Sequence, residues 1–261
     1  MSIKAISISK TYFPFGDGAG GVRALNRVSI DINEGTCTLV RGPTGSGKST
    51  LLALLACISP PTEGEMAFDR VHLPGAAETE LSLFRERYVG FIPQSTLLIG
   101  ELTLLENILA PHVFLGGRAR ELKPRALVLL ERLGLGGKAG FLPRELSEGE
   151  KKKGMAARAL LKEPLYLFGD EPVAHLDEDS ARSVLGLFWE LRRKGSAVVL
   201  AAHGLSRLEE CMTVYELLRG EVVSCTRMGE KGKSAKRPPG TPGVDRMGRD
   251  KRWKPRNQRK P

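Results

Sequence analysis

The chain has 261 residues and a formal net charge of +10, and 41% of its residues are hydrophobic. This length suits one large domain with a sizeable core, followed by a tail. No uninterrupted apolar run approaches the roughly 20 residues that cross a bilayer, and the first residues lack the basic and then apolar pattern of a secretory leader. We therefore expect a cytoplasmic protein whose scattered cysteines (Cys37, Cys57, Cys211 and Cys225) are small core residues in a reducing compartment.

The excess positive charge lies at the C-terminus. Residues 227–261 hold 13 Lys and Arg against three acids, which leaves 27 basic and 27 acidic residues in residues 1–226. Because Gly, Pro, Lys and Arg dominate this segment, it cannot bury enough apolar surface to offset its ordering entropy. We predict a folded domain over residues 1–226 and a disordered basic tail over 227–261. The tail is interpreted as a solvated extension or as a contact with anionic lipids; nucleic-acid binding is disfavoured because stacking aromatics are nearly absent.

Alternating apolar residues predict strands over residues 3–8 and 28–32. We expect them to belong to an antiparallel N-terminal β-subdomain, with glycine-rich residues 15–21 as a flexible hairpin-like connection. Further strands are predicted at residues 38–40, 66–68, 88–93, 165–168 and 197–201, with a final pair near 214–224. Helices are predicted from the end of the first glycine-rich turn to about residue 59, through most of 103–134, and over 148–162 and 178–194.

Helices between buried apolar strands favour a largely parallel sheet. The long helical stretch predicts a small helical subdomain, about residues 95–145, inserted into this α/β body. The fold class expected is therefore α/β, with a mostly parallel sheet core.

The turn after the strand at residues 38–40 reads Gly42-Pro43-Thr44-Gly45-Ser46-Gly47-Lys48-Ser49-Thr50 and leads into a leucine-rich helix. Its glycines let successive backbone N–H groups point into one concavity that holds phosphate oxygens, and the helix N-terminus adds partial positive charge. We expect Lys48 to reach the β- and γ-phosphates and the Ser49 hydroxyl to bind Mg²⁺. The complete spacing between a strand and a helix predicts a nucleoside triphosphate site of the P-loop NTPase kind.

Two acids end the apolar strand at residues 165–168. Asp170 and Glu171 follow it at the carboxyl edge of the expected sheet, where ligands bind in open α/β folds. We expect Asp170 to hold Mg²⁺ and Glu171 to act as the general base toward water.

With these motifs the sequence resembles the ATP-binding subunit of ABC transporters over roughly residues 3–224. The stretch Leu146-Ser147-Glu148-Gly149-Glu150 stands at the place of the family's signature motif. The resemblance implies that Ser147 and Gly149 reach the ATP of a second subunit, either a second copy or a paralogous ATPase. It also implies that Gln94 is the Q-loop residue that senses Mg²⁺ and that Asp177 belongs to the D-loop.

The resemblance further implies that His203 is the switch histidine at the γ-phosphate. Tyr12 is matched to the aromatic residue that stacks on adenine, with Phe13 and Phe15 as alternatives. Residues 102–107 and Glu150 are most similar to the subgroup for lipoprotein release, macrolide export and cell division. Such subunits work with a separate permease at the inner membrane, which implies a peripheral position on its cytoplasmic face.

The signature departs from the family pattern at Glu148, where the family has glycine. This side chain places negative charge near a phosphate. Lys151, Lys152 and Lys153 follow, and we expect at least one of them to face the phosphate and offset that charge. The hypothesis is that ATP is bound and hydrolysed while closure of the dimer is weakened. Alternatives are a regulatory subunit with little turnover and a soluble ABC-type ATPase that acts on nucleic acid or ribosomes.

Overall fold

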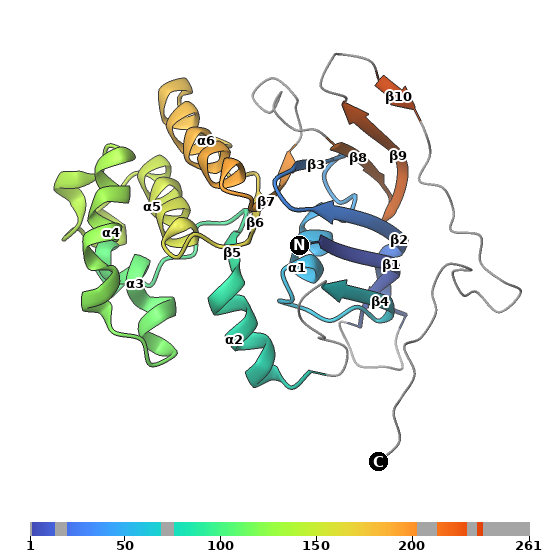
Figure 1. The fold of residues 1–261 in the computed structure, drawn as a ribbon, viewed down its shortest axis with the longest axis horizontal. Helices are drawn as coiled ribbons and strands as arrows, with labels where there is room; N and C mark the ends of the chain where they lie inside the picture. The colour runs from blue at the N-terminus through green and yellow to red at the C-terminus, as the bar shows by residue number, and fades with distance from the viewer. Residues whose placement is uncertain (1, 14–19, 69–75, 203–212, 229–233, 237–261) are drawn as a thin grey trace, which may run out of the picture.

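The computed structural model describes residues 2–13, 20–68, 76–202, 213–228 and 234–236 (Figure 1). Its strands are β1 (Ser2–Tyr12), β2 (Val22–Asn33), β3 (Cys37–Arg41), β4 (Glu63–Phe68), β5 (Val89–Ile92), β6 (Tyr166–Asp170), β7 (Ala197–Ala202), β8 (Thr213–Leu218), β9 (Glu221–Met228) and β10 (Ser234–Lys236). Its α-helices are α1 (Lys48–Leu55), α2 (Glu78–Tyr88), α3 (Leu104–Phe114), α4 (Ala119–Arg132), α5 (Glu148–Leu160) and α6 (Glu178–Arg193). Short 3₁₀ turns lie at Gly136–Lys138 and Pro143–Glu145.

The strands form two sheets. The larger one has the order β10-β9-β8-β3-β7-β6-β5, and its five strands from β8 to β5 are parallel. The smaller one, β2-β1-β4, is antiparallel. A mostly parallel α/β core with an antiparallel N-terminal sheet confirms the predicted fold class.

Both faces of the large sheet are buried. Successive residues of its central strands point alternately into one of two hydrophobic cores. Val40, Phe168 and Val199 pack with α1 and the small sheet. Leu39, Leu167 and Leu200 pack with α5 and α6 on the other side. The near-continuous apolar character of these strands follows from this two-sided burial.

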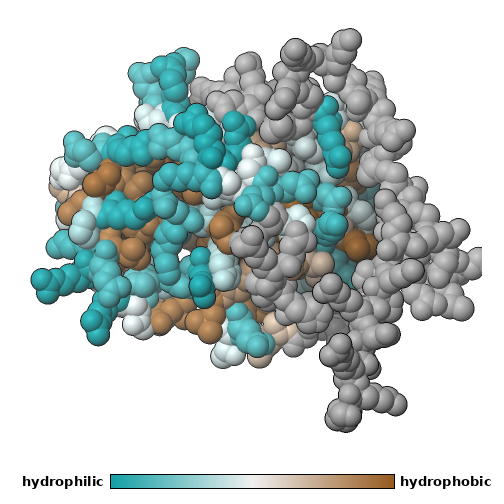
Figure 2. All heavy atoms as spheres, viewed as in Figure 1, coloured by the Kyte–Doolittle hydropathy of each residue, from teal (hydrophilic) through white to brown (hydrophobic). Residues whose placement is uncertain are grey.

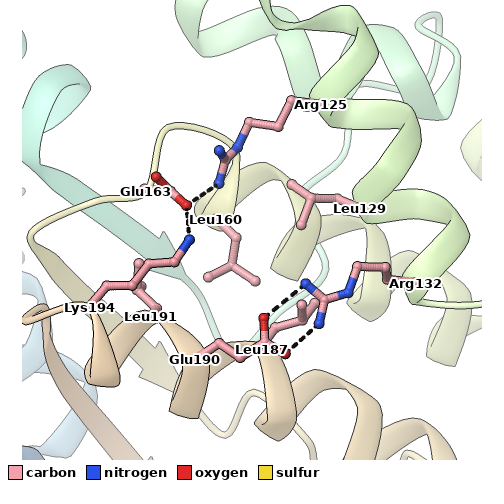
Figure 3. A pocket seen from close by; sticks show the side chains of 9 residues that line it. All are labelled: Arg125, Leu129, Arg132, Leu160, Glu163, Leu187, Glu190, Leu191 and Lys194. Atoms are coloured by element: carbon pink, nitrogen blue, oxygen red, sulfur yellow. Dashed lines mark hydrogen bonds and ion pairs between the residues drawn. The ribbon is translucent and has the colours of Figure 1, made fainter.

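Helices α3, α4 and α5 lie together at one end of the molecule, away from the small sheet (Figure 1). Ion pairs connect this group to α6 across a shallow pocket with a leucine floor: Arg132 of α4 contacts Glu190, while Arg125 and Lys194 share Glu163 (Figure 3). These side chains are 40–62% exposed, so each pair stabilises the contact by about 1 kcal/mol or less.

Several predicted boundaries were wrong. Helix α1 ends at Leu55 rather than near residue 59, because Cys57 adopts a φ of 57° and the chain leaves the helix. The stretch 103–134 is mostly helical, as predicted, and contains two helices separated at residues 115–118, where Gly116 has a φ of 84°. Strand β4 begins earlier than predicted because Gly64, at a φ of 87°, approaches β1 so closely that a Cβ would lie 2.4 Å from the Ser7 carbonyl oxygen.

Helix α2 was not predicted, and among its residues only Phe84 is fully buried. At the C-terminus, β9 crosses the predicted boundary at residue 226 and β10 pairs with it, so residues 227–228 and 234–236 of the predicted tail lie in strands. Cys57 and Cys225 are free, whereas Cys37 is disulfide-bonded, which corrects the expectation for that cysteine.

None of the helices in the described part of the chain has both the length and the apolar character needed to span a bilayer. The helical end of the face drawn in Figure 2 is largely hydrophilic, with small hydrophobic patches between the charged side chains.

Candidate functional site

The phosphate loop (residues 42–50) joins β3 to α1, as predicted. Gly47 caps α1 with a φ of 101°, and a Cβ there would lie 2.5 Å from the Ala24 carbonyl oxygen. At Gly42 a Cβ would lie 2.1 Å from the Leu217 carbonyl oxygen. These two positions admit only glycine, because backbone from β2 and β8 closes against the loop. Since the Gly220 N–H also donates to the Ser46 carbonyl oxygen at 2.9 Å, the loop is held from both sides.

Two polar side chains of the phosphate loop, Ser46 and Lys48, are buried. Lys48 is 5% exposed, and its Nζ donates to the carbonyl oxygens of Gly42 at 2.8 Å and Pro43 at 3.0 Å. The Ser46 Oγ is buried and has no hydrogen-bond partner within the described part of the chain. A buried ammonium beside an unsatisfied hydroxyl and a helix N-terminus fits an anion with several oxygens.

The predicted metal ligands come together at the carboxyl edge of the large sheet. Asp170, at the end of β6, is 3% exposed and lies near the Ser49 side chain. Both line a cavity of about 370 Å³ together with Gln94, Phe91, Pro93 and Ser95. Burial raises the pKa of Asp170, and the nearby Glu171 charge adds to the effect, while Ser49, Lys48 and Lys152 oppose it. A hydroxyl, an amide and a carboxyl on one cavity are the oxygen donors that a hard divalent cation prefers.

Glu171 directly follows β6 in an unusual backbone conformation. Its φ is 49°, a left-handed value that is uncommon for a residue with a side chain. The Glu171 N–H donates to the Ala201 carbonyl oxygen of β7 at 2.9 Å. Strained backbone is common at functional sites, but Glu163 and Arg219 have similar φ values of 47° and 49°, so the general-base role of Glu171 stays a prediction.

Lys152 lies close to the predicted base. At least one of the three lysines 151–153 was expected to face phosphate, and Lys152 itself is 6% exposed and turns into the protein. Its Nζ donates to the carbonyl oxygens of Glu171 at 3.0 Å and Ala174 at 3.1 Å. Burial lowers the pKa of Lys152, and the charges of Glu171, Asp170 and Glu148 oppose this. Helical periodicity could have placed it correctly, because it lies on one buried face of α5 with Met155, Ala156 and Ala159.

The signature residues lie at the start of α5, and their side chains form hydrogen bonds with other residues of this chain. Ser147 is the N-cap and forms a capping box with Glu150. The Glu148 carboxylate accepts a hydrogen bond from the Thr96 Oγ1 at 3.1 Å and pairs with Lys151 Nζ at 2.7 Å. The Lys151 ion pair is the main cause of the lowered pKa of Glu148, followed by the hydrogen bond from Thr96. The contact between Thr96 and Glu148 was not predicted, because the two residues are distant in the sequence and meet only in the folded chain.

The D-loop residue lies beside the signature. Asp177 caps α6 by accepting a hydrogen bond from the Ser180 N–H at 2.8 Å, which lowers the Asp177 pKa. A Cβ on Gly149 would meet the Leu176 side chain at 3.4 Å, so the two motifs are packed together.

Of the two remaining candidate residues, Tyr12 lies within the described part of the chain and His203 does not. Tyr12 ends β1 opposite Val22 and is 45% exposed, with the Lys10 ammonium 5.4 Å from its ring centre. The ring is thus partly exposed, with the Lys10 ammonium over one of its faces. His203 lies outside the described residues.

Comparison with known proteins agrees with this geometry. The sequence profile of the ABC transporter family matches residues 25–174. The chain is 38% identical over 203 residues to the lipoprotein-releasing system ATP-binding protein LolD of Aquifex aeolicus, covering 78% of this chain and 91% of that protein. It is 35% identical over 217 residues to a macrolide export ATP-binding/permease protein, MacB 1/2 of Paracoccus denitrificans, covering 83% of this chain and 32% of that protein.

A solved structure shares the fold over nearly its whole length. It is an ATP-binding cassette in a dimeric, post-hydrolysis state bound to ADP and Pi. The two structures have a TM-score of 0.81 and 31% sequence identity, over 87% of this chain and 99% of that one. The phosphate loop, the acids after β6 and the extent of these matches lead to one conclusion: the chain belongs to the ABC transporter family, as an ATP-binding subunit.

Proposed function

We propose that this chain binds Mg-ATP in the cavity between the phosphate loop and the end of β6, hydrolyses it, and thereby drives a separate membrane permease. The observation that supports this most directly is that Ser49, Gln94 and Asp170 line one cavity at the end of β6. The related cassette bound to ADP and Pi supports the same reaction.

The phosphate loop is the proposed cradle for the triphosphate. Lys48 would exchange its two loop carbonyls for oxygens of the β- and γ-phosphates, and the unsatisfied Ser46 hydroxyl would donate to another. Backbone N–H groups would supply the remaining donors, with partial positive charge from the start of α1. The loop residues assigned to this role are Gly42, Pro43, Thr44, Gly45, Ser46, Gly47, Lys48, Ser49 and Thr50.

Ser49, Gln94 and Asp170 are the residues proposed to hold Mg²⁺. A divalent ion bound there supplies positive charge that offsets the negative charge developing on the phosphates. Because the carboxylate form of Asp170 is the better ligand, the raised pKa of this group favours occupation of the site at neutral rather than acidic pH.

Glu171 is the proposed general base, which accepts a proton from the attacking water as the water oxygen bonds to the γ-phosphorus and the bond from that phosphorus to the bridging oxygen breaks, so that ADP leaves and phosphate forms. Lys48 balances charge on the same phosphate. His203 is assigned to the γ-phosphate and Tyr12 to the adenine ring, from their places in the sequence; the exposure of Tyr12 is compatible with stacking.

A second subunit is proposed to complete the site. Ser147, Gly149 and Asp177 would then approach the nucleotide held by the partner, either another copy of this chain or a paralogous ATPase. The dimeric state of the related cassette supports this arrangement. The ATP-binding domain would span residues 1–226. In the proposed dimer, its helical segment of about residues 95–145 would transmit closure to the permease.

The permease is proposed to be a separate membrane protein, by similarity to the relative that is the ATP-binding protein of a lipoprotein-releasing system. This partner would keep the chain on the cytoplasmic face of the inner membrane. The basic residues beyond 227 suit an additional contact with anionic lipids.

Glu148→Gly should raise the Mg-ATP turnover by roughly three- to tenfold, the scale of one weak charge contact with a phosphate. The substitution removes a carboxylate that is exposed at the start of α5 and bound to Thr96 and Lys151. Steady-state phosphate release by the native and variant chains measures the effect. Glu178→Gly is the matched control, because Glu178 begins α6 as Glu148 begins α5.

An unchanged or lower rate in Glu148→Gly would show that Glu148 does not hinder closure. The same carboxylate favours a second candidate function, in which the chain is a regulatory subunit that binds ATP with little turnover. A native rate at background together with measurable ATP binding would support that candidate.

The proposed function is tested by phosphate release from ATP by the purified full chain. We expect turnover that needs Mg²⁺ and falls to background when the metal is removed with EDTA, and that returns when Mg²⁺ is restored. Turnover unaffected by EDTA would contradict the assignment of Ser49, Gln94 and Asp170. Affinity purification from membranes tests the permease, which should be recovered as an integral membrane protein.

A further inference from the structure

Among the residues that the structure describes, Lys152 is a buried charged side chain that the proposed mechanism leaves without a role. It projects from α5, one turn after the signature residues, and its ammonium group bonds to two backbone carbonyls of the turn after β6. A buried ammonium is costly unless its donors are satisfied. The hydrogen bonds to the Glu171 and Ala174 carbonyl oxygens therefore indicate the role of this lysine.

The turn that receives these bonds has a strained backbone. Glu171 has a φ of 49° and His175 a φ of 63°. The Ala174 N–H donates to the Glu171 carbonyl oxygen at 3.1 Å, so this oxygen accepts from both Ala174 and Lys152. Such conformations persist only where the surroundings over-determine them.

The other side of Glu171 is fixed by the sheet. Its N–H is bonded to Ala201 of β7. Pro172 folds back over β6, where a Cβ on Gly169 would lie 2.9 Å from the proline Cγ. The peptide group before Glu171 is thus held by the sheet, and the carbonyl after it is held by Lys152.

We propose that Lys152 is a positioning residue for Glu171: its buried ammonium group clamps the carbonyl oxygens of Glu171 and Ala174 and so holds the strained turn that aims the Glu171 carboxylate. The clamp also links the helix that carries the signature to the turn that carries the base. This inference rests on the proposed hydrolysis of ATP, and it adds a residue that acts through Glu171 without touching the nucleotide.

The test replaces Lys152 with methionine, which keeps the length of the side chain and removes its donors. A displaced catalytic group lowers the rate strongly even when the shift is about 1 Å. We expect kcat for Mg-ATP to fall about 10- to 100-fold, while KM and the Kd for a fluorescent ATP analogue stay within about threefold. Lys123→Met, at an exposed position of α4, is the matched control and should leave both constants unchanged.

A double-mutant cycle separates positioning from a general loss of structure. In a Glu171→Gln background, Lys152→Met should lower the residual rate by less than twofold, because the group that it positions is already gone. A further loss as large as that in the native background would overturn the inference. If the methionine variant does not accumulate as folded protein, Lys152→Ser takes its place, since it leaves room for water beside both carbonyls, with the same expected and contrary results.

The outcomes also distinguish this inference from the proposed function. Turnover that Lys152→Met leaves unchanged overturns the role of Lys152 alone. Absence of turnover in the native chain overturns both.

Discussion

Replacing Glu171 with glutamine should lower Mg-ATP turnover by at least about 100-fold, the contribution of a well-placed general base. The amide has nearly the same shape as the carboxylate but cannot accept the proton of the attacking water. Because Glu171 is not among the residues proposed to bind phosphate or metal, the Kd for Mg-ATP should stay within about threefold. Steady-state phosphate release and fluorescence titration measure the two quantities.

The control for this substitution is Glu121→Gln, an exposed position in the first turn of α4. It makes the same chemical change outside the site and should leave kcat and Kd at the native values. A Glu171→Gln variant that retains native turnover would exclude Glu171 as the base. Loss of ATP binding in the same variant would mean that Glu171 holds the nucleotide rather than the water.

Replacing Lys48 with alanine should remove both binding and turnover. The ammonium group is buried at 5% exposure and is the cation that begins α1 inside the phosphate loop. Hydrogen bonds to charged groups are stronger than neutral ones, about 1.5–3 kcal/mol each. With contacts to two phosphates we expect Mg-ATP affinity to fall by at least about 100-fold, with a similar or larger fall in kcat/KM.

Thermal unfolding with and without Mg-ATP measures this loss directly. A ligand at 100 times its Kd stabilises the folded state by about 2.7 kcal/mol, so the native chain should unfold at a clearly higher temperature with ligand. Lys48→Ala should lose that shift, Glu171→Gln should keep it, and Lys123→Ala on exposed α4 should behave as the native chain. A ligand-dependent shift retained in Lys48→Ala would refute the assignment of Lys48 to the phosphates.

Lys48→Ala should also lower the melting temperature without ligand, because Lys48 Nζ satisfies the Gly42 and Pro43 carbonyl oxygens in the loop. The ligand-dependent shift is therefore compared within each variant, so that this stability effect and the loss of binding are separated.

Much of the fold could be predicted from local patterns. Strands β3, β6 and β7 are short apolar runs, and α6 has a clear amphipathic face that buries Leu185, Phe188 and Leu191. Helix α2 lacks such a face and was missed. The position of the break between α3 and α4 was not predicted, because it depends on Gly116 at a positive φ and on the approach of Gly117 to the His112 ring, where a Cβ would lie 2.1 Å from the ring.

The sequence alone determined the phosphate loop and the acids at the end of β6, because both are contiguous motifs whose chemistry follows from residue type and spacing. Only the tertiary structure decided how distant segments meet. It brought Gln94 to the cavity of Ser49 and Asp170, placed Thr96 against Glu148, and turned Lys152 toward the carbonyl of Glu171. The physical reason is that three adjacent lysines have the same chemistry, and the direction of each depends on which face of α5 is buried by the rest of the chain.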